Sequence, residues 1–315
     1  MFMPKSSGCK LGFGNKAGSF MLYTRLLVFL AVARHLSFTK ASRQLCISQP
    51  AITKHIAALE SYYNVSLFDR KGSSISLSAA GELLLSHARK IKKDVTELDF
   101  AMHLLNQNYT GSIRVGASTT IAQYVLPKPL AAFCEHYTGL EISLVNDNSD
   151  NIQKALLNHE IDVGLVENAT RSVDLDYEPF LDDELVLVAS GLAHIDKEID
   201  LESFKRMPLI LREYGSGTLE VIESVLNEHN IKLGDLNVRM HMGSTEAIKL
   251  FLQNSSCLGI VSIYSIAREL IDRSLKIIDL ENITFRRKFS FVTNRGAHLD
   301  YIDKFTDFVK ENIEL

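Results

Sequence analysis

Polar side chains that can hydrogen bond to DNA bases stand at the start of a short helical pattern near residue 48. Gln49, Thr53 and Lys54 fall on one side of this pattern. The apolar positions recur at the spacing of one buried helix face: Ile52, Ile56 and Leu59. An amide pairs favourably with the edge of adenine and an ammonium group with guanine. The pattern therefore indicates a helix that offers polar side chains to a major groove.

A second helical pattern, from about Phe38 to Leu45, precedes this one across a very tight connection. Ser37 and Ser48 are expected to cap the two helices, because a serine hydroxyl can accept a hydrogen bond from an unpaired amide of the first turn. Pro50 lies in the first turn of the second helix, where its missing amide proton costs nothing. Spacing alone fits either a helix-turn-helix or an ordinary helical hairpin.

The distribution of charge favours the DNA-binding alternative. Residues 21–90 contain nine lysines and arginines against three acidic residues, whereas residues 111–315 contain 20 basic and 32 acidic residues. A basic module joined to an acidic one is typical of a nucleic-acid-binding protein with a separate functional domain.

Residues 26–81 resemble the DNA-binding domain of the LysR-type transcriptional regulators. The matching runs, in order, are Leu26-x-x-Phe29, Ser37-Phe-Thr-x-Ala41, Leu45-x-x-Ser48-Gln-Pro-Ala51, Leu59-Glu60, Leu67-Phe68-x-Arg70 and Leu77-Ser-x-Ala-Gly81. Two departures are small. Asn64 replaces the usual glycine, and asparagine tolerates the same left-handed backbone, while Ser78 replaces a usual threonine and keeps the hydroxyl.

The resemblance implies a winged helix-turn-helix over residues 21–82 that binds double-stranded DNA. The wing is expected from Leu67-Phe68 and Ile75–Leu77, and its tip would place Arg70 and Lys71 on phosphates, which fix register but carry no sequence information. Arg70 could instead pair with Asp69 or remain solvated. The residues predicted to contact DNA are Ser37, Thr39, Ser48, Gln49, Pro50, Thr53, Lys54, Arg70 and Lys71.

A single long helix is expected after Gly81, followed by a polar hinge at Gln107–Gly111. Its apolar positions are spaced alternately by four and three residues: Leu84, Ala88, Ile91, Val95, Leu98, Met102 and Leu105. So narrow a stripe suits a helix that pairs with its own copy, although it could also lie on the protein's own effector domain. The resemblance favours the first alternative, with residues 83–110 as a dimerisation linker and Leu84, Ile91, Val95, Leu98 and Leu105 as its contact residues. A homodimer or homotetramer would then bind a pseudo-palindromic site.

Residues 111–315 alternate between strand and helix patterns, which implies parallel sheets in two α/β lobes. The expected strands are 113–117, 140–145, 161–166, 184–189, 209–212, 238–242, 258–263, 275–279 and 285–293, and the expected helices include 127–137, 151–159 and 299–312. This region resembles the periplasmic-binding-protein-like effector domain of the same family. By that resemblance, lobe one comprises about 111–183 and 286–315, and lobe two about 184–285. The expected fold class is α/β, with an N-terminal all-α winged helix-turn-helix, a long linker helix and this two-lobed domain.

Hydroxyl and amide side chains follow several of the expected strands, where ligands of open α/β sheets bind. The predicted effector-binding residues are Ser118, Thr119, Thr120, Asn148, Arg212, Ser216, Thr218, Ser244 and Thr245. Each hydroxyl could also be a simple helix cap. Helix N-termini with added hydroxyls favour an anion, and Arg212 could pair with a carboxylate or oxoanion. A small anionic or polar metabolite is therefore the expected effector, and no cofactor or metal is expected.

Other classes of protein are disfavoured by what the sequence lacks. It contains no nucleophile elbow, dinucleotide fingerprint, metal-ligand pair or kinase signature, which argues against an enzyme. Residues 1–20 lack the apolar core of a signal peptide and are expected to be a disordered extension, with Met21 as an alternative start. No apolar run approaches the roughly 20 residues of a membrane helix. Four scattered cysteines, Cys9, Cys46, Cys134 and Cys257, fit a reducing cytoplasm, with small buried side chains expected.

Overall fold

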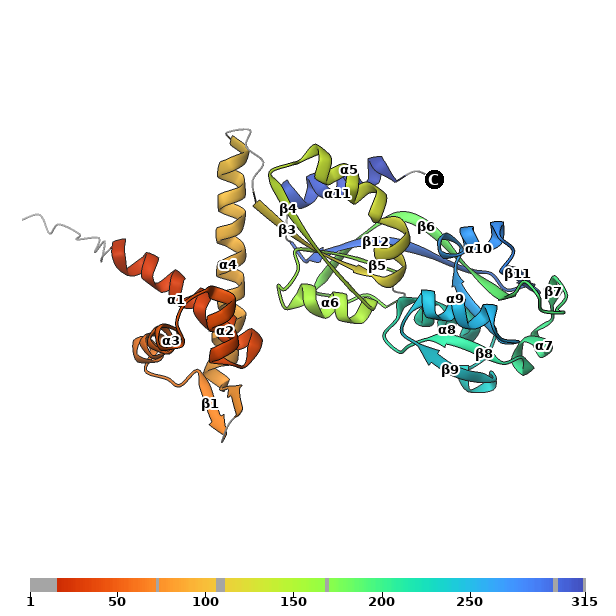
Figure 1. Cartoon of the computed structure of the whole chain (residues 1–315), viewed down its shortest axis with the longest axis horizontal. Coiled ribbons are helices and arrows are strands. Elements are labelled where there is room, and N and C mark those ends of the chain that lie inside the picture. The colour runs from red at the N-terminus through yellow and green to blue at the C-terminus, as the bar shows by residue number, and fades with distance from the viewer. Residues whose placement is uncertain (1–15, 72–73, 106–110, 168–169, 297–299, 314–315) are drawn as a thin grey trace, which may run out of the picture. The chain divides into compact units, whose positions relative to one another are not determined.

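The computed structural model describes residues 16–71, 74–105, 111–167, 170–296 and 300–313 (Figure 1). The chain divides into an N-terminal and a C-terminal unit between Val95 and Thr96. This division falls inside one long helix, α4 (Ala79–Leu105). The expected hinge at Gln107–Gly111 lies, apart from Gly111, outside the described residues.

Three helices form the body of the N-terminal unit: α1 (Lys16–His35), α2 (Phe38–Leu45) and α3 (Gln49–Tyr63). The predicted caps are confirmed, because the Ser37 hydroxyl accepts from the Lys40 amide at 3.3 Å and the Ser48 hydroxyl from the Ala51 amide at 3.4 Å. Asn64 ends α3 with φ 51° and ψ 44°, the left-handed conformation expected from its replacement of glycine.

The core of this unit is made where the helices meet the start of α4. Phe29, Ile52 and Leu59 are completely buried, and Ala88 of α4 is 1% exposed in the same cluster. Burying one large apolar side chain stabilises a fold by about 1.5 to 3 kcal/mol. The apolar stripe of α3 therefore packs in the core, and the opposite side of that helix faces solvent.

A two-stranded wing follows α3. Strands β1 (Phe68–Lys71) and β2 (Ser74–Leu77) pair antiparallel, with Phe68 opposite Leu77. The Glu60 carboxylate accepts from the Leu67 amide at 2.9 Å and fixes the entry to β1. After β2, the Ser78 hydroxyl donates to the Ser66 carbonyl at 2.6 Å and accepts from the Gly81 amide at 3.0 Å, which anchors the start of α4 beside the wing.

Two expectations, one for the N-terminus and one for the cysteines, need correction. Helix α1 begins at Lys16, so the last five residues of the expected disordered extension are helical, and its first 15 residues lie outside the described chain. Cys46 and Cys134 are exposed and Cys257 is half-buried, rather than all being small buried side chains. Cys46 ends α2 at φ 54°, and Cys134 lies on α5 (Pro127–His136) beside Phe133, which takes the buried position.

The C-terminal unit contains one ten-stranded sheet flanked by helices. Lobe one contains β3 (Gly111–Ser118), η1 (Ile121–Val125), α5, β4 (Leu140–Asp147), α6 (Ser149–Leu157), β5 (Val163–Val166) and α11 (Asp300–Asn312). Lobe two contains β7 (Glu198–Ile199), α7 (Leu201–Arg206), β8 (Leu209–Arg212), α8 (Gly217–Glu228), η2 (Leu233–Asp235), β9 (Val238–Met242), α9 (Thr245–Gln253), β10 (Leu258–Ser262), η3 (Ile263–Ser265), α10 (Ala267–Ile271) and β11 (Leu275–Leu280).

Two long strands, β6 (Leu175–Ser190) and β12 (Phe285–Asn294), run through both lobes and pair antiparallel with each other (Figure 1). Arg287 lies opposite Asp183 in this pair, so the two predicted crossing points face one another. The expectation of separate parallel sheets was wrong, because β6 is also antiparallel to β10 and β11. Among the described residues, parallel pairing occurs within β3, β4 and β5, within β8, β9 and β10, and between β7 and β11.

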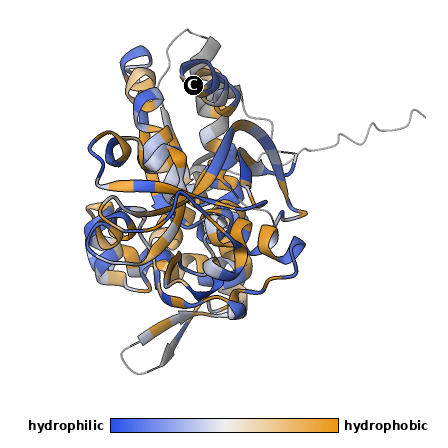
Figure 2. Ribbon diagram, turned by 90° about the vertical axis from the view of Figure 1, so that its right-hand side faces the viewer, coloured by the Kyte–Doolittle hydropathy of each residue, from blue (hydrophilic) through white to orange (hydrophobic). Residues whose placement is uncertain are grey.

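Each lobe has its own apolar core. Phe133, Phe289 and Phe305 are buried in lobe one, and Phe204 and Ile222 in lobe two. Figure 2 shows that the helices carry both orange, apolar residues and blue, polar ones, as expected for helices that cover a sheet on one side only. Of the helices in the described ranges, none combines the length and apolar character needed to cross a membrane.

Candidate functional site

The first candidate site is the exposed start of α3. Gln49, Pro50, Thr53 and Lys54 are all exposed, because the buried stripe of the helix takes its other side. Thr39 of α2 is also exposed, and its hydroxyl lies 3.4 Å from the Gln49 side-chain oxygen. The fold therefore brings Thr39, at the start of α2, next to the polar end of α3.

The remaining residues predicted to contact DNA are two helix caps and two residues of the wing. Ser37 is half-buried and Ser48 exposed, and both hydroxyls are engaged as helix caps. The backbone of Arg70 and Lys71 lies in β1 of the wing. The side chains of these two residues lie outside the part of the chain that the structure describes.

The apolar stripe of α4 divides into two parts. Leu84 and Ala88 pack in the core of the N-terminal unit, so they are used within the protomer. Further along, Ile91 is 41% exposed and Leu98 60% exposed, and Val95 is partly exposed. The Leu105 side chain lies outside the described residues. Within this stripe, the exposed positions are thus those after Ala88.

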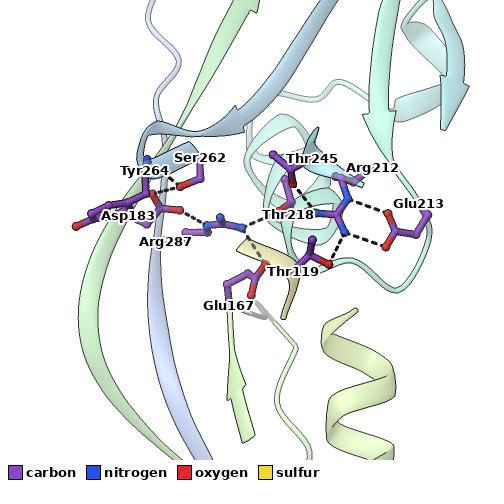
Figure 3. Close-up of polar contacts among 10 residues, drawn as sticks. All are labelled: Thr119, Glu167, Asp183, Arg212, Glu213, Thr218, Thr245, Ser262, Tyr264 and Arg287. Atoms are coloured by element: carbon purple, nitrogen blue, oxygen red, sulfur yellow. Dashed lines mark hydrogen bonds and ion pairs between the residues drawn. The ribbon is translucent and has the colours of Figure 1, made fainter. Parts of the chain in front are cut away.

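The second candidate site lies where the two lobes meet and is built around Arg212, at the end of β8. We call Thr119, Arg212, Glu213 and Thr245 the Arg212 cluster (Figure 3). The buried guanidinium donates from Nη2 to the Thr119 hydroxyl of lobe one at 3.3 Å and from Nη1 to the Thr245 hydroxyl of lobe two at 3.2 Å. It also pairs with both carboxylate oxygens of Glu213, at 2.8 and 2.9 Å. Three of the predicted effector-binding residues therefore meet at one guanidinium.

The other predicted effector-binding residues surround this junction in different roles. Ser244 and Asn148 cap α9 and α6 through their side chains. Ser216 is the N-cap residue of α8, but its side chain makes no capping hydrogen bond, and the Asp150 amide of lobe one donates to the neighbouring Gly215 carbonyl at 3.2 Å. Ser118 and Thr120 are both buried, and the Ser118 hydroxyl has no hydrogen-bond partner among the described residues.

A neighbouring group of charges was missed by the sequence analysis. We call Glu167, Asp183, Thr218, Ser262 and Arg287 the Arg287 cluster (Figure 3). Arg287 Nε donates to Asp183 at 2.6 Å, and Nη1 donates to Thr218 at 2.9 Å and lies 3.4 Å from Glu167. Asp183 also accepts from the Ser262 hydroxyl at 2.7 Å. Only Thr218 was predicted, because the ionic members are far apart in the chain: Asp183 and Arg287 lie within strands β6 and β12, and Glu167 directly follows β5.

A third contact joins the lobes near α9. The hydroxyl of Tyr124, in lobe one, donates to Glu246, in lobe two, and Lys249 pairs with Glu246 at 2.7 Å. Burial and the hydrogen bond to Glu246 raise the pKa of the Tyr124 phenol. Burial also raises the pKa of Glu246, but hydrogen bonds from Lys249 and Tyr124 outweigh it and leave that pKa below its ordinary value. The contact is therefore a neutral phenol on a carboxylate at neutral pH.

The junction is suited to binding rather than to a bond-breaking reaction. Its polar groups are guanidinium and hydroxyl donors held by neighbouring carboxylates, which can recognise a small polar or acidic molecule. Within the described ranges, no group of three or more His, Cys, Asp or Glu side chains could hold a metal ion.

Comparison with known proteins gives concordant results for both units. Residues 23–82 match the family model of the bacterial regulatory helix-turn-helix protein, lysR family, and residues 106–314 match that of the LysR substrate binding domain. The chain is 30% identical to the HTH-type transcriptional activator CmpR of Synechocystis, over 90% of this chain and 92% of that protein. It is also 30% identical to the RuBisCO operon transcriptional regulator of Allochromatium vinosum, over 87% and 90%. Among solved structures, the CcmR regulatory domain of Synechocystis in complex with 2-PG is 27% identical, with a TM-score of 0.59, covering 64% of this chain and 97% of that one.

Proposed function

The chain belongs to the LysR family of transcriptional regulators, and from this premise we propose how its two units carry out regulation. The N-terminal unit binds a pseudo-palindromic promoter site in double-stranded DNA, and the C-terminal unit binds a small anionic or polar effector between its lobes. The effector acts by binding one DNA-bound arrangement of the protein better than another. The proposal places the protein in the cytoplasm, where promoters are.

The observation that carries this proposal is the division of α3 into two faces. Ile52, Ile56 and Leu59 are buried in the core, while Gln49, Thr53 and Lys54 stand exposed at the helix N-terminus. A recognition helix contacts base edges through residues of its N-terminal part. The excess of basic residues in 21–90 supplies the attraction to phosphates that positions this helix.

We expect Lys54→Ala to weaken specific DNA binding by about 1 to 3 kcal/mol, the usual contribution of a side chain that reads a base edge. The measurement is fluorescence anisotropy over a range of salt concentrations, with a DNA site selected from a random pool by the wild-type protein. Lys154→Ala, on α6 of the C-terminal unit, removes the same charge and is the matched control. An equal loss with every DNA sequence would show that Lys54 contacts phosphate instead of a base.

The proposed subunit arrangement uses the second half of α4. Ile91, Val95 and Leu98 continue the apolar stripe beyond the N-terminal core and remain at least partly exposed. A narrow stripe of this kind suits the pairing of two helices. We therefore propose 83–110 as the dimerisation linker between the DNA-binding domain, 21–82, and the effector domain, 111–315. The assembly is a dimer or a tetramer.

The proposed effector site is the Arg212 cluster together with the surrounding predicted residues. Thr119 and Thr245 come from different lobes and share one guanidinium, so a ligand bound there contacts both lobes. The similarity to a regulatory domain solved with 2-PG supports an acidic metabolite. The buried Ser118 hydroxyl, without a partner among the described residues, is a further group that could bind the ligand.

We expect Thr119→Ala to weaken the response to effector while leaving DNA affinity nearly unchanged. Loss of one hydrogen bond costs about 0.5 to 1.5 kcal/mol, so the ligand concentration for a half-maximal thermal shift should rise several-fold. The first measurement is a thermal-shift screen against small anionic metabolites, including 2-PG. Thr138→Ala, at an exposed turn of the same lobe, is the control. If Thr119→Ala abolished DNA binding instead, Thr119 would be part of the scaffold and not of the site.

A further inference from the structure

Arg212 is a buried cation whose only charged partner among the described residues is the next residue in the chain. Its side chain is 2% exposed, and Glu213 contacts it through both carboxylate oxygens, at 2.8 and 2.9 Å. The two threonines that complete its surroundings are neutral. Glu213 therefore supplies the negative charge that this buried guanidinium requires.

The two arginines at the lobe junction differ in how accessible their acidic partners are. The Glu213 side chain is 27% exposed, so this carboxylate borders solvent. Around Arg287, the Asp183 and Glu167 side chains are 0% and 2% exposed. Releasing either of these would leave a charge buried in the protein, whereas Glu213 can leave Arg212 and enter water. Of these three counterions, only Glu213 is exchangeable.

The backbone around Glu213 also allows such an exchange. Strand β8 ends at Arg212, so Glu213 lies just outside the ladder. A turn follows directly, in which the Ser216 amide donates to the Glu213 carbonyl at 3.2 Å and Gly215 adopts φ +83°. Neighbouring side chains in a strand point to opposite faces. Leaving the strand is what lets the Glu213 side chain turn back onto Arg212, and the same freedom lets it turn away.

We propose that the Glu213 carboxylate holds the place of the effector's acidic group on Arg212, and that an anionic effector binds by displacing it. The inference rests on the effector site proposed above and adds a class of ligand to it. That ligand carries a compact acidic group with at least two oxygens, a carboxylate or a phosphate, which replaces both hydrogen bonds of Glu213. Thr119 and Thr245 can then donate their hydroxyl hydrogens to the same group.

This arrangement makes Glu213 a built-in competitor that sets the effector concentration at which the protein responds. Only molecules in which Arg212 is free can bind the anion, and the apparent Kd equals the intrinsic Kd divided by the fraction of such molecules. A neutral ligand could accept hydrogen bonds from Arg212 but would not replace the negative charge of Glu213, and a cationic ligand would be repelled by the guanidinium. The glutamate thus restricts the site to acidic ligands and weakens their apparent affinity.

The test is the isosteric change Glu213→Gln in the full-length protein, which removes the competing charge. We measure melting temperature against the concentration of inorganic phosphate, and separately of 2-PG, at constant ionic strength. The expected result is a half-maximal shift at about tenfold lower ligand concentration than in the wild type, because a neutral amide holds the guanidinium less strongly than a carboxylate does. Adding Arg212→Gln to the same variant should abolish the shift.

Two further variants keep this result interpretable. Glu213→Ala should behave like Glu213→Gln, which excludes an effect of the new amide. Glu202→Gln, which breaks an exposed ion pair with Lys205 in the same lobe, should leave the titration unchanged. The inference is wrong if the half-maximal shift of Glu213→Gln occurs at the same or a higher ligand concentration than in the wild type. It is also wrong if this variant shows no shift at all.

The same protein preparations separate this inference from the proposed function. If the wild type binds its selected DNA and responds to 2-PG but Glu213→Gln does not bind more tightly, only the role of Glu213 is wrong. If the wild type binds no DNA selected from a random pool, the proposed function itself is wrong, whatever the phosphate titration shows.

Discussion

Replacing Arg287 with methionine is expected to lower the free energy of unfolding of the C-terminal unit by about 3 to 5 kcal/mol. Asp183 and Glu167 are 0% and 2% exposed at their side chains, and Arg287 is the basic group that contacts both. Removing it leaves two carboxylates buried without a counterion, which costs much more than the hydrogen bonds themselves contribute. Urea denaturation followed by circular dichroism measures the loss.

Arg286 provides a matched control for this change. It is the preceding residue on β12, and its side chain is exposed, so Arg286→Met should alter stability by no more than about 0.5 kcal/mol. Adding Asp183→Asn and Glu167→Gln to Arg287→Met removes the stranded charges and should recover much of the loss. If Arg287→Met were as mild as Arg286→Met, the Arg287 cluster would not be an ionic support of the fold.

The Arg287 cluster lies between the two lobes, so changing it should affect their relative geometry as well as stability. Arg287 and Asp183 face each other on β12 and β6, the two strands that pass between the lobes. The same guanidinium contacts Glu167, which follows β5 of lobe one, and Thr218, at the start of α8 in lobe two. We therefore expect variants of Arg287 to change the geometry of the lobes as well as their stability, whereas Arg212 variants should mainly change ligand binding.

Replacing Gly81 with alanine is expected to destabilise the N-terminal unit by about 3 kcal/mol, at the upper end of the usual cost of overpacking. An added Cβ would lie 2.1 Å from the Leu67 carbonyl oxygen and 2.9 Å from a methyl group of Leu77. Alanine is favoured over glycine within a helix by about 1 kcal/mol, but this gain is smaller than the cost of the clash. Because the carbonyl belongs to the backbone beside the wing, α4 and the wing must move apart.

DNA binding is the direct readout of the Gly81 variant. We expect Gly81→Ala to lose specific binding at the temperature where the wild type binds, while the melting of the C-terminal unit stays unchanged. Gly234→Ala is the matched control, because an added Cβ there meets nothing within 4 Å. Normal DNA affinity in Gly81→Ala would mean that the start of α4 can shift without disturbing the DNA-binding unit.

Local patterns in the sequence were sufficient to predict the DNA-binding unit. The caps at Ser37 and Ser48, the buried stripe of α3 and the turn at Asn64 each depend on residues a few positions apart, and the structure contains all of them. In the C-terminal unit the same local signals placed β8 and β9 correctly. They recovered only the second half of β6, because its first half includes Pro179 and ends at Asp182 and Asp183, residues that read as a loop.

The sequence by itself thus determined the family, the second helix of the helix-turn-helix and the hydroxyl groups at the ends of the strands, since these depend on contacts between near neighbours and on characteristic spacing. Only the tertiary structure decided how the charges pair. Arg287 and Asp183 are separated by 104 positions and Arg212 and Thr119 by 93, and each meets its partner only because the sheet brings distant strands together. Glu213 is adjacent to Arg212 in the sequence, but its proposed role as a displaceable counterion depends on burial. The fold removes water from the arginine side chain and leaves the glutamate side chain partly exposed.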